Sequence, residues 1–262
     1  QDTVVVVHCH IFKNAGSTFD WSLKRNFGTA MIEHRDPHGK PLGGAELTRL
    51  IAGPPAARAV SSHAVSLPLP QVPERRLFPA IFLRHPIERV YSVYMFERRQ
   101  REVTPGSTHA SKLNFRDYVS WRLRPETAAV IRDYQTRYCA GFLGQHDVPI
   151  TDMQLARAGY FLEQTELLGL VEDYDDSMVM FEHVLGKCIG DVDLSYVHQN
   201  ASRYRERGKG RLFSRLFRGA QTPMPYQKQL AGAVVSPRPE GAVGAQGHRV
   251  SPSRRHGLPG SR

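Results

Sequence analysis

Runs of apolar residues without a helical period mark the predicted strands of this chain. The opening run, Val4–Val7, consists of four consecutive valines, which is typical of a strand buried on both faces. A polar turn with one glycine, Lys13–Thr18, follows it. Apolar residues then recur at four-residue spacing, at Phe19, Leu23 and Phe27. We therefore expect a helix that Ser17 or Thr18 caps and that Gly28 ends.

Two further apolar runs predict strands that each end beside a polar residue. Residues 57–62 lead to His63, and residues 77–83 lead to Arg84. A third short run, at 167–170, fits another strand. Because ligands of open parallel sheets bind outside the carboxyl ends of the strands, His63 and Arg84 are candidate site residues.

Helical periodicity fills most of the remaining sequence. Between residues 86 and 101 the apolar positions form one stripe, and Pro86 suits the first helical position. Further helices are predicted at 115–123, 126–139, 152–162 and 175–185. This alternation predicts an α/β protein, a three-layer sandwich with a central parallel sheet. We expect one domain over residues 1–207 and a largely disordered tail over 208–262, which is rich in Gly, Pro and Arg.

The excess positive charge lies in that tail. The chain has a formal net charge of +10, yet residues 1–206 hold 24 basic and 24 acidic residues, whereas 207–262 hold eleven basic residues against Glu240. The neutral body gives no indication of a specific nucleic-acid partner, and we interpret the tail as a solvated appendage that binds polyanions adventitiously.

The compartment is predicted from the cysteines and from the hydropathy pattern. Three widely spaced cysteines, Cys9, Cys139 and Cys188, are expected to be buried free thiols, which favours a reducing compartment. No apolar stretch approaches the roughly 20 residues of a membrane span, and Val4–Val7 is too short for the core of a signal peptide. We expect a cytoplasmic protein, although a Golgi-lumen domain whose membrane anchor had been removed would look the same.

The turn Lys13–Thr18 has the properties of a phosphate-binding turn. A turn between a buried strand and a helix presents main-chain N–H groups and the positive end of the helix dipole, and Lys13 adds a full charge. An ATP- or GTP-binding loop would need glycine at its start and Lys directly before Ser or Thr. Here Lys13 comes four residues before Ser17, so it would meet a leaving group from the strand side.

The segment His10–Phe19 resembles the 5′-phosphosulfate-binding loop of the carbohydrate sulfotransferases related to heparan sulfate 2-O- and 6-O-sulfotransferases. In this chain Phe12 stands at the position where that family usually has Pro. The segment Phe82–Tyr94 is similar to the 3′-phosphate-binding segment of that family. Segments 135–141, 168–177 and 200–203 are similar too, so the resemblance covers roughly residues 3–205. It implies the sulfotransferase fold, which is like that of phosphate-loop NTPases, and 3′-phosphoadenosine 5′-phosphosulfate (PAPS) as sulfate donor.

The resemblance also implies a set of site residues. The nucleotide contacts would be Lys13, Asn14, Ala15, Gly16, Ser17 and Thr18 at the 5′ end, Arg84 and Ser92 at the 3′-phosphate, and Asn200, Ser202 and Arg203 near the adenine or the 3′-phosphate. His63 matches the strand-end histidine that serves as general base. His8 and His10 are rival bases, and being two residues apart on a strand they would face the same side.

The sequence also gives candidate residues for the acceptor side. Gln135, Arg137 and His10 are candidate contacts to a carbohydrate or polysaccharide acceptor, although a solvated helix face would equally explain Gln135 and Arg137. The mechanism needs no metal, and the sequence shows no cluster of ligands with convincing spacing. The predicted enzyme transfers a sulfuryl group from PAPS to a carbohydrate hydroxyl by in-line displacement, with Lys13 and His63 as catalytic residues. The alternatives are a phosphate-loop nucleotide kinase and a catalytically silent polyanion-binding module.

Overall fold

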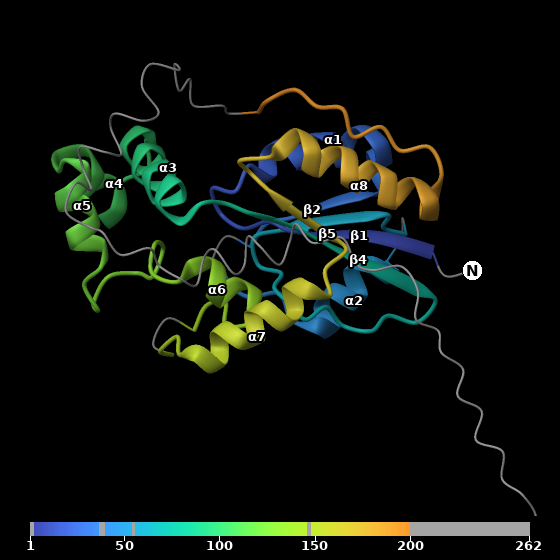
Figure 1. Cartoon of the computed structure of the whole chain (residues 1–262), viewed down its shortest axis with the longest axis horizontal. Helices are drawn as coiled ribbons and strands as arrows, with labels where there is room; N and C mark the ends of the chain where they lie inside the picture. Colours follow the sequence, from blue (N-terminus) through green and yellow to red (C-terminus); the bar gives the residue numbers. More distant parts are fainter. Residues whose placement is uncertain (1–2, 37–39, 54–55, 146–147, 200–262) are drawn as a thin grey trace, which may run out of the picture.

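A single sheet of five parallel strands organises the molecule (Figure 1). The computed structural model describes residues 3–36, 40–53, 56–145 and 148–199. The strands are β1 (Thr3–Cys9), β2 (Met31–His34), β3 (Ala59–Ser62), β4 (Arg75–Leu83) and β5 (Leu167–Leu170), in the order β2-β3-β1-β4-β5. The valine run thus forms the central strand, where both faces are covered, as its composition predicts.

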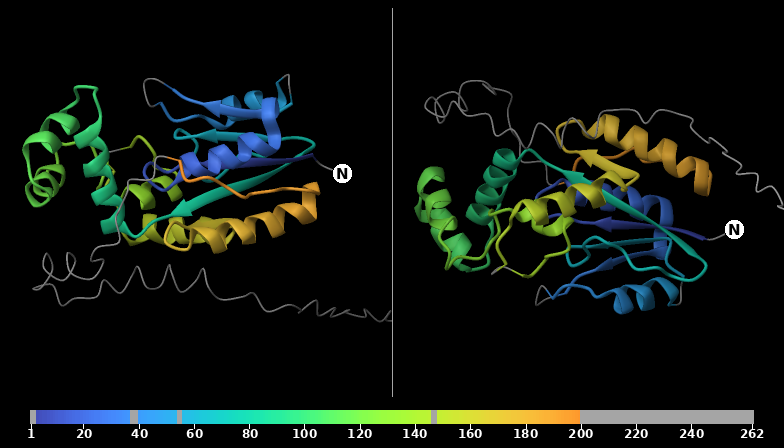
Figure 2. Two further views of the ribbon diagram at one scale, coloured as in Figure 1. Left: turned by 90° about the horizontal axis from the view of Figure 1, so that it is seen from above. Right: turned by 60° about the horizontal axis from the view of Figure 1, so that its bottom comes forward.

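Side chains of β1 alternate between two hydrophobic cores. Val4 and Val6 pack in the core that α1 (Gly16–Phe27) and α8 (Tyr174–Ile189) cover, and Figure 2 shows these two helices side by side on one face of the sheet. Val5 and Val7 pack in the core on the other face. The helices of that face are α2 (Gly44–Ala52), α6 (Tyr134–Cys139) and α7 (Asp152–Glu163). The α/β sandwich of three layers is therefore confirmed.

Three helices lie beyond the carboxyl edge of the sheet. They are α3 (Pro86–Arg99), α4 (Pro105–Lys112) and α5 (Phe115–Arg122), drawn in green at the left of Figure 1. They share a small core of their own that includes Tyr94 and Tyr118. Inside it, the carboxylate of Glu97 accepts from the guanidinium of Arg122 and, over 2.6 Å, from the hydroxyl of Tyr118. The three helices α3, α4 and α5, called the helical arm below, therefore pack together as a unit beyond the carboxyl ends of the strands.

The chain leaves β1 and β4 toward opposite faces of the sheet. After β1 it enters α1, on the face shared with α8, whereas the chain after β4 returns to β5 through α6 and α7 on the other face. Where adjacent parallel strands part in this way, ligands of open α/β sheets bind outside the carboxyl ends of the strands. The phosphate turn follows β1 and Arg84 follows β4, so both lie at this position.

Most predicted elements agree with the structure. The strand predicted at 167–170 is β5, and Pro86 is the first residue of α3. The helix predicted at 126–139 is wrong in its first half, because α6 begins only at Tyr134, after Asp133 adopts a left-handed conformation with φ of 47°. Segments 126–133 instead form turns, in which Thr127 Oγ1 donates to the carbonyls of Arg122 and Arg124.

Two smaller predictions also need correction. Ser17 and Thr18 do not cap α1: the helix begins at Gly16, and its cap residue, Ala15, is left-handed and makes no side-chain cap bond. The thiols of Cys9 and Cys139 are buried and free, as predicted, but Cys188 is exposed because it lies on the outer side of α8 near its end.

Two sets of predictions concern the remaining parts of the chain. The tail 208–262 and the candidate ligands Asn200, Ser202 and Arg203 lie outside the described residues. Among the helices that the structure does describe, none is long and apolar enough to span a membrane.

Candidate functional site

Left-handed residues shape the phosphate turn. Lys13 and Ala15 have φ values of 67° and 59°, and α1 then begins at Gly16. Because Ala15 offers no side-chain acceptor, the first N–H groups of α1 are not satisfied by a side-chain cap. Ser17 is exposed and Thr18 is buried in the first turn of the helix. The geometry suits an anion, since free amides and the positive end of the helix dipole meet at one place.

The structure brings Arg84 to this turn. Its guanidinium Nη1 donates to the carbonyl oxygen of Lys13 over 3.1 Å. Gln135 holds the main chain of Arg84 on both sides: Nε2 of Gln135 donates to the Arg84 carbonyl, and Oε1 accepts from the Arg84 N–H, each over 2.9 Å. The amide side chain of Gln135 thus extends the hydrogen bonding of β4 and fixes the point at which Arg84 projects.

Asn14 ties the same turn to the end of β4. Its Nδ2 donates to the carbonyl of Phe82 and to Oε1 of Gln135, both over 2.7 Å, and its side chain is 2% exposed. Arg137, the other acceptor candidate on α6, is buried, and its Nη1 donates to the carbonyl of Gln145 over 2.7 Å. In this structure Gln135 and Arg137 therefore bond within the protein, and neither forms a solvated helix face.

One face of α3 packs against the phosphate turn. Arg89, which is 2% exposed, donates from Nε to the carbonyl of Phe12 and from both terminal nitrogens to Val130, each over 3.0 Å. Phe96, two turns later, contacts the ring of Phe12 at a centroid distance of 5.3 Å. Ser92 lies between Arg89 and Phe96 at helical spacing, so it shares the face that looks toward the turn.

Three cationic side chains, Lys13, Arg84 and Arg99, lie near one another at this face of α3. The ammonium of Lys13 lies 4.7 Å from the centre of the Phe96 ring. Burial lowers the pKa of Lys13, and the charges of Arg84 and Arg99 lower it further. Within the described part of the chain, none of these three cations forms an ion pair with a carboxylate. A bound anion would relieve this repulsion between like charges.

His63 lies directly after β3, beside the main chain of His10. The Nδ1 atom of His63 is 2.6 Å from the carbonyl oxygen of His10, and the two rings are 3.9 Å apart. Since a carbonyl only accepts, Nδ1 carries the proton and Nε2 holds a lone pair. The residue is exposed on one side, but desolvation and the neighbouring His10 lower the pKa of His63 to about 4. His63 is therefore neutral near pH 7 and able to accept a proton at Nε2.

Asp20 on α1 joins His8 of β1 to His10, which follows the strand. Its Oδ1 is 2.7 Å from Nδ1 of His8, and its Oδ2 is 3.0 Å from Nδ1 of His10. The rings of His8 and His10 stack at 4.8 Å, which confirms that they face the same side. Burial alone would raise the pKa of Asp20, but His8 and His10 outweigh it and hold that pKa far below its usual range. Asp20 is therefore a carboxylate at neutral pH.

Asp20 is the site residue that the sequence reasoning missed. A weak signal was present, because Asp20 stands between the core residues Phe19 and Leu23 on a helix whose other side is polar. Together His8, His10 and Asp20 place one ligand atom each within 4.8 Å of one another. These are donor types that a metal ion accepts, but each ring already directs Nδ1 to the carboxylate.

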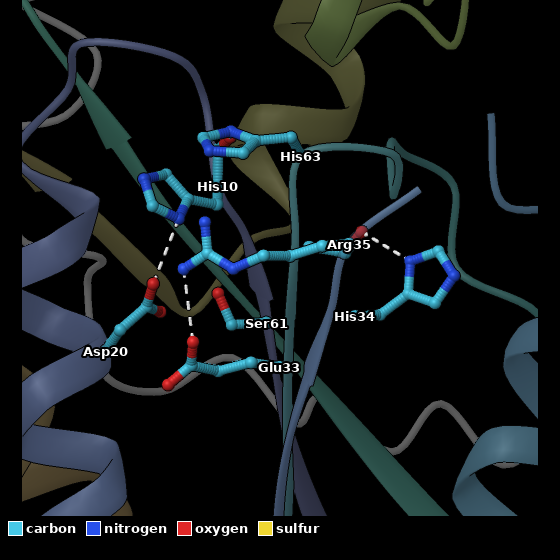
Figure 3. A pocket seen from close by; sticks show the side chains of 8 residues that line it. His10, Asp20, Glu33, His34, Arg35, Ser61 and His63 are labelled. Atoms are coloured by element: carbon cyan, nitrogen blue, oxygen red, sulfur yellow. Dashed lines mark hydrogen bonds and ion pairs between the residues drawn. The ribbon is translucent and has the colours of Figure 1, made fainter. Parts of the chain in front are cut away.

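A small cavity opens beside these histidines (Figure 3). Its walls come from the ends of β2 and β3, from His10 and from Asp20; they are His10, Asp20, Glu33, His34, Arg35, Ser61, Ser62 and His63. The side chain of Arg35 reaches across it toward His10 and pairs with Glu33 over 3.1 Å. Its polar walls suit a hydroxyl group or a water molecule next to His63.

The chain matches no family model. A protein of Archaeoglobus fulgidus, described only as an uncharacterized protein, is 31% identical over 209 residues, which span 76% of this chain and 80% of the archaeal one. The chain belongs to the same family as this archaeal protein. That description names no activity, so the chemistry of this family has to be argued from the side chains of the site.

Proposed function

We propose that this protein is a sulfotransferase that moves the sulfuryl group of PAPS to a hydroxyl group of a carbohydrate. The observation that supports this most is the 3.1 Å hydrogen bond from Arg84 to the carbonyl of Lys13. The sequence resemblance assigns these residues to opposite ends of one nucleotide, Lys13 to the 5′-phosphosulfate and Arg84 to the 3′-phosphate. A nucleotide with anions at both positions needs two such sites close together.

The location and charge of the site favour an anionic nucleotide. Lys13 and Arg84 follow the adjacent strands β1 and β4, whose connections leave toward opposite faces, and this is where a ligand of an open sheet is expected. Arg84 presents a planar fork, which suits a dianionic phosphate. Ser92 lies on the neighbouring face of α3 and would add a hydroxyl donor. The phosphate turn lacks a Lys directly before Ser or Thr, which argues against an ATP-binding loop.

The proposed step is an in-line displacement. The bond between sulfur and the bridging phosphate oxygen breaks while a new bond forms between sulfur and the acceptor oxygen. Lys13 and the free amides of α1 stabilise the charge that develops on the departing phosphate. The acceptor proton moves to Nε2 of His63, the unprotonated nitrogen of that ring. The cavity beside His63 is the place where the acceptor hydroxyl would enter.

The remaining predicted contacts keep the roles that the resemblance gives them. Asn14 and the turn residues Ala15 to Thr18 would surround the phosphosulfate. Asn200, Ser202 and Arg203 stay predictions for the adenine side. For Gln135 the bonds to Arg84 and Asn14 favour support of the nucleotide site over contact with the acceptor.

Two measurements test this proposal. Thermal unfolding should shift to higher temperature with PAPS, or with its product 3′-phosphoadenosine 5′-phosphate, and not with ATP and magnesium. Transfer of radiolabelled sulfate from PAPS to a panel of polysaccharides should label at least one of them. Stabilisation by ATP alone would favour the nucleotide kinase, and polysaccharide binding without any transfer would favour the silent binding module.

A further inference from the structure

His10 stands between the proposed base and the phosphate turn. Its ring packs between His8 and His63, with ring centres 4.8 Å and 3.9 Å away, and the residue is 8% exposed. Its Nδ1 faces Asp20 Oδ2 at 3.0 Å. A carboxylate behind Nδ1 of a histidine fixes the orientation of the ring and stabilises its positively charged form.

The other edge of the His10 ring faces the start of α1. A Cβ atom on Gly16 would lie 2.3 Å from His10 Nε2 and 2.2 Å from Cδ2, so only a residue without a side chain fits there. Gly16 is the first residue of α1, where the free N–H groups lie. Within the part of the chain that the structure describes, His10 Nε2 has no hydrogen-bond partner. This nitrogen is thus an unpartnered, almost buried polar atom directed at the phosphate turn.

We propose that Asp20 and His10 form a carboxylate–imidazole pair that takes up one proton when the phosphosulfate end of the nucleotide binds at the start of α1. Charged His10 then donates a hydrogen bond from Nε2 to that anion. The inference rests on the proposed function, because it takes the turn after β1 as the phosphosulfate site. The proton comes from solvent on binding and returns to solvent when the product nucleotide leaves.

The charged groups around His10 explain why its protonation state would depend on whether the phosphosulfate anion is bound. The groups that face it are Asp20 from α1, His8 from β1, Glu33 and Arg35 from the end of β2, and His63 after β3. Burial lowers the pKa of His10; Asp20 opposes this, whereas His8 and Arg35 add to it. The positive end of α1 acts in the same direction as Arg35. His10 is therefore neutral near pH 7, and binding of an anion would raise its pKa.

The two histidines then have different parts in the transfer step. His63 accepts the proton of the acceptor hydroxyl, and His10 neutralises charge on the departing phosphate. In sulfuryl transfer the acceptor oxygen and the departing phosphate oxygen lie within a few ångströms of each other, on either side of the sulfur. The 3.9 Å between the rings of His63 and His10 matches this spacing. Asp20 acts through His10 and is therefore a positioning residue.

Calorimetric titration with 3′-phosphoadenosine 5′-phosphate tests the proposal in the full chain. Near pH 7, titrations in two buffers of different ionisation enthalpy should reveal uptake of up to one proton per nucleotide, and affinity should rise as the pH falls through the range in which His10 of the complex titrates. Asp20→Asn and His10→Gln should abolish the uptake and weaken binding by about tenfold. His183→Asn is the control, because His183 is an exposed histidine of α8 that is not among the walls of the cavity; it should leave uptake unchanged.

The outcomes separate the inference from the proposed function. Tight binding without proton uptake, or uptake that persists in His10→Gln, would overturn the role of His10 and leave the nucleotide site intact. No binding at all would overturn both. Because Asp20→Asn removes a buried bridge between two histidines, a second measurement uses the unaltered protein. Nitrogen NMR of labelled histidine should show Nε2 of His10 becoming protonated on nucleotide addition, and an unchanged Nε2 signal would contradict the proposal.

Discussion

The guanidinium of Arg84 reaches the main-chain carbonyl of Lys13 across 71 positions of sequence. The bond joins the end of β4 to the turn after β1. Among the described residues Nη2 of Arg84 has no partner and can contact a ligand, whereas Nε is buried. Burial lowers the pKa of Lys13, and the positive charge of Arg84 lowers it further. The hydrogen bond thus keeps the positive charges of Lys13 and Arg84 close together, and a bound anion would offset their repulsion.

Replacing Lys13 by alanine should reduce sulfate transfer by at least about tenfold, because a full charge opposite the departing phosphate is lost. The fold should survive, since among the described residues the contacts of the Lys13 ammonium are with the aromatic rings of Phe12 and Phe96. The measurement is radiolabelled transfer alongside circular dichroism. Arg124→Ala, which removes an exposed cation just after the helical arm, is the control and should transfer at the normal rate. Full activity in Lys13→Ala would remove Lys13 from the mechanism.

Replacing Gly16 by alanine should displace the His10 ring. The new Cβ would lie 2.2 Å from His10 Cδ2, so the imidazole or the first turn of α1 has to move. Overpacking of this kind costs about 1–3 kcal/mol of the free energy of unfolding. Gly159→Ala is the matched control, because nothing lies within 4 Å of a Cβ there; in the interior of α7 it should add about 0.5–1 kcal/mol.

Chemical denaturation of both variants checks this contrast. Gly16→Ala should also weaken binding of 3′-phosphoadenosine 5′-phosphate, whereas Gly159→Ala should not. A Gly16→Ala protein as stable as its Gly159→Ala counterpart would show that His10 does not pack against α1 in solution.

Gln135 should matter for stability as well as for the nucleotide. Gln135→Ala leaves the N–H and carbonyl of Arg84 and one donor of Asn14 without their partner, and unsatisfied buried groups cost about 1–3 kcal/mol. Denaturant unfolding measures the loss. Gln164→Ala, at an exposed helix end, should change stability far less. Unchanged stability with a raised KM for the acceptor alone would instead favour the acceptor role first predicted for Gln135.

His63→Ala should slow transfer by at least about tenfold, a lower bound set beneath the roughly 10²–10⁴-fold that a general base typically contributes. The pH dependence should be informative too. A base works only when neutral, and the pKa of His63 is lowered to about 4 in the free protein. The transfer rate at saturating PAPS should therefore fall only at pH values below the ordinary range of histidine, and His63→Ala should lose that acid limb. An undiminished rate in His63→Ala would point to His10 as the base.

The sequence predicts those elements whose residues carry their own local signal. Val4–Val7 and the β5 run are buried on both faces, so their apolar character shows without any knowledge of the fold. β2 was not predicted, because at this edge of the sheet only Met31 among its residues is buried. The α4 helix was also missed, although Thr104 and Ser107 form a capping box around it.

Part of the candidate site was also predicted from local sequence signals. Lys13, Arg84 and His63 follow strands, so the sequence alone places them at one edge of a parallel sheet. The contact of Asp20 with His8 and His10 depends on how α1 packs on β1, and the support of Arg84 by Gln135 joins residues 51 positions apart. Such long-range contacts follow from the packing of complete elements, which local patterns do not specify.

The central claim is that Arg84 and the phosphate turn hold the two anionic ends of one nucleotide. Calorimetry should compare 3′-phosphoadenosine 5′-phosphate with AMP, which lacks the 3′-phosphate, in the unaltered protein and in Arg84→Ala. We predict that the unaltered protein prefers the bisphosphate by at least about tenfold, as expected for a charge-assisted contact, and that Arg84→Ala loses this preference. Equal affinity of the unaltered protein for the two nucleotides would contradict the account.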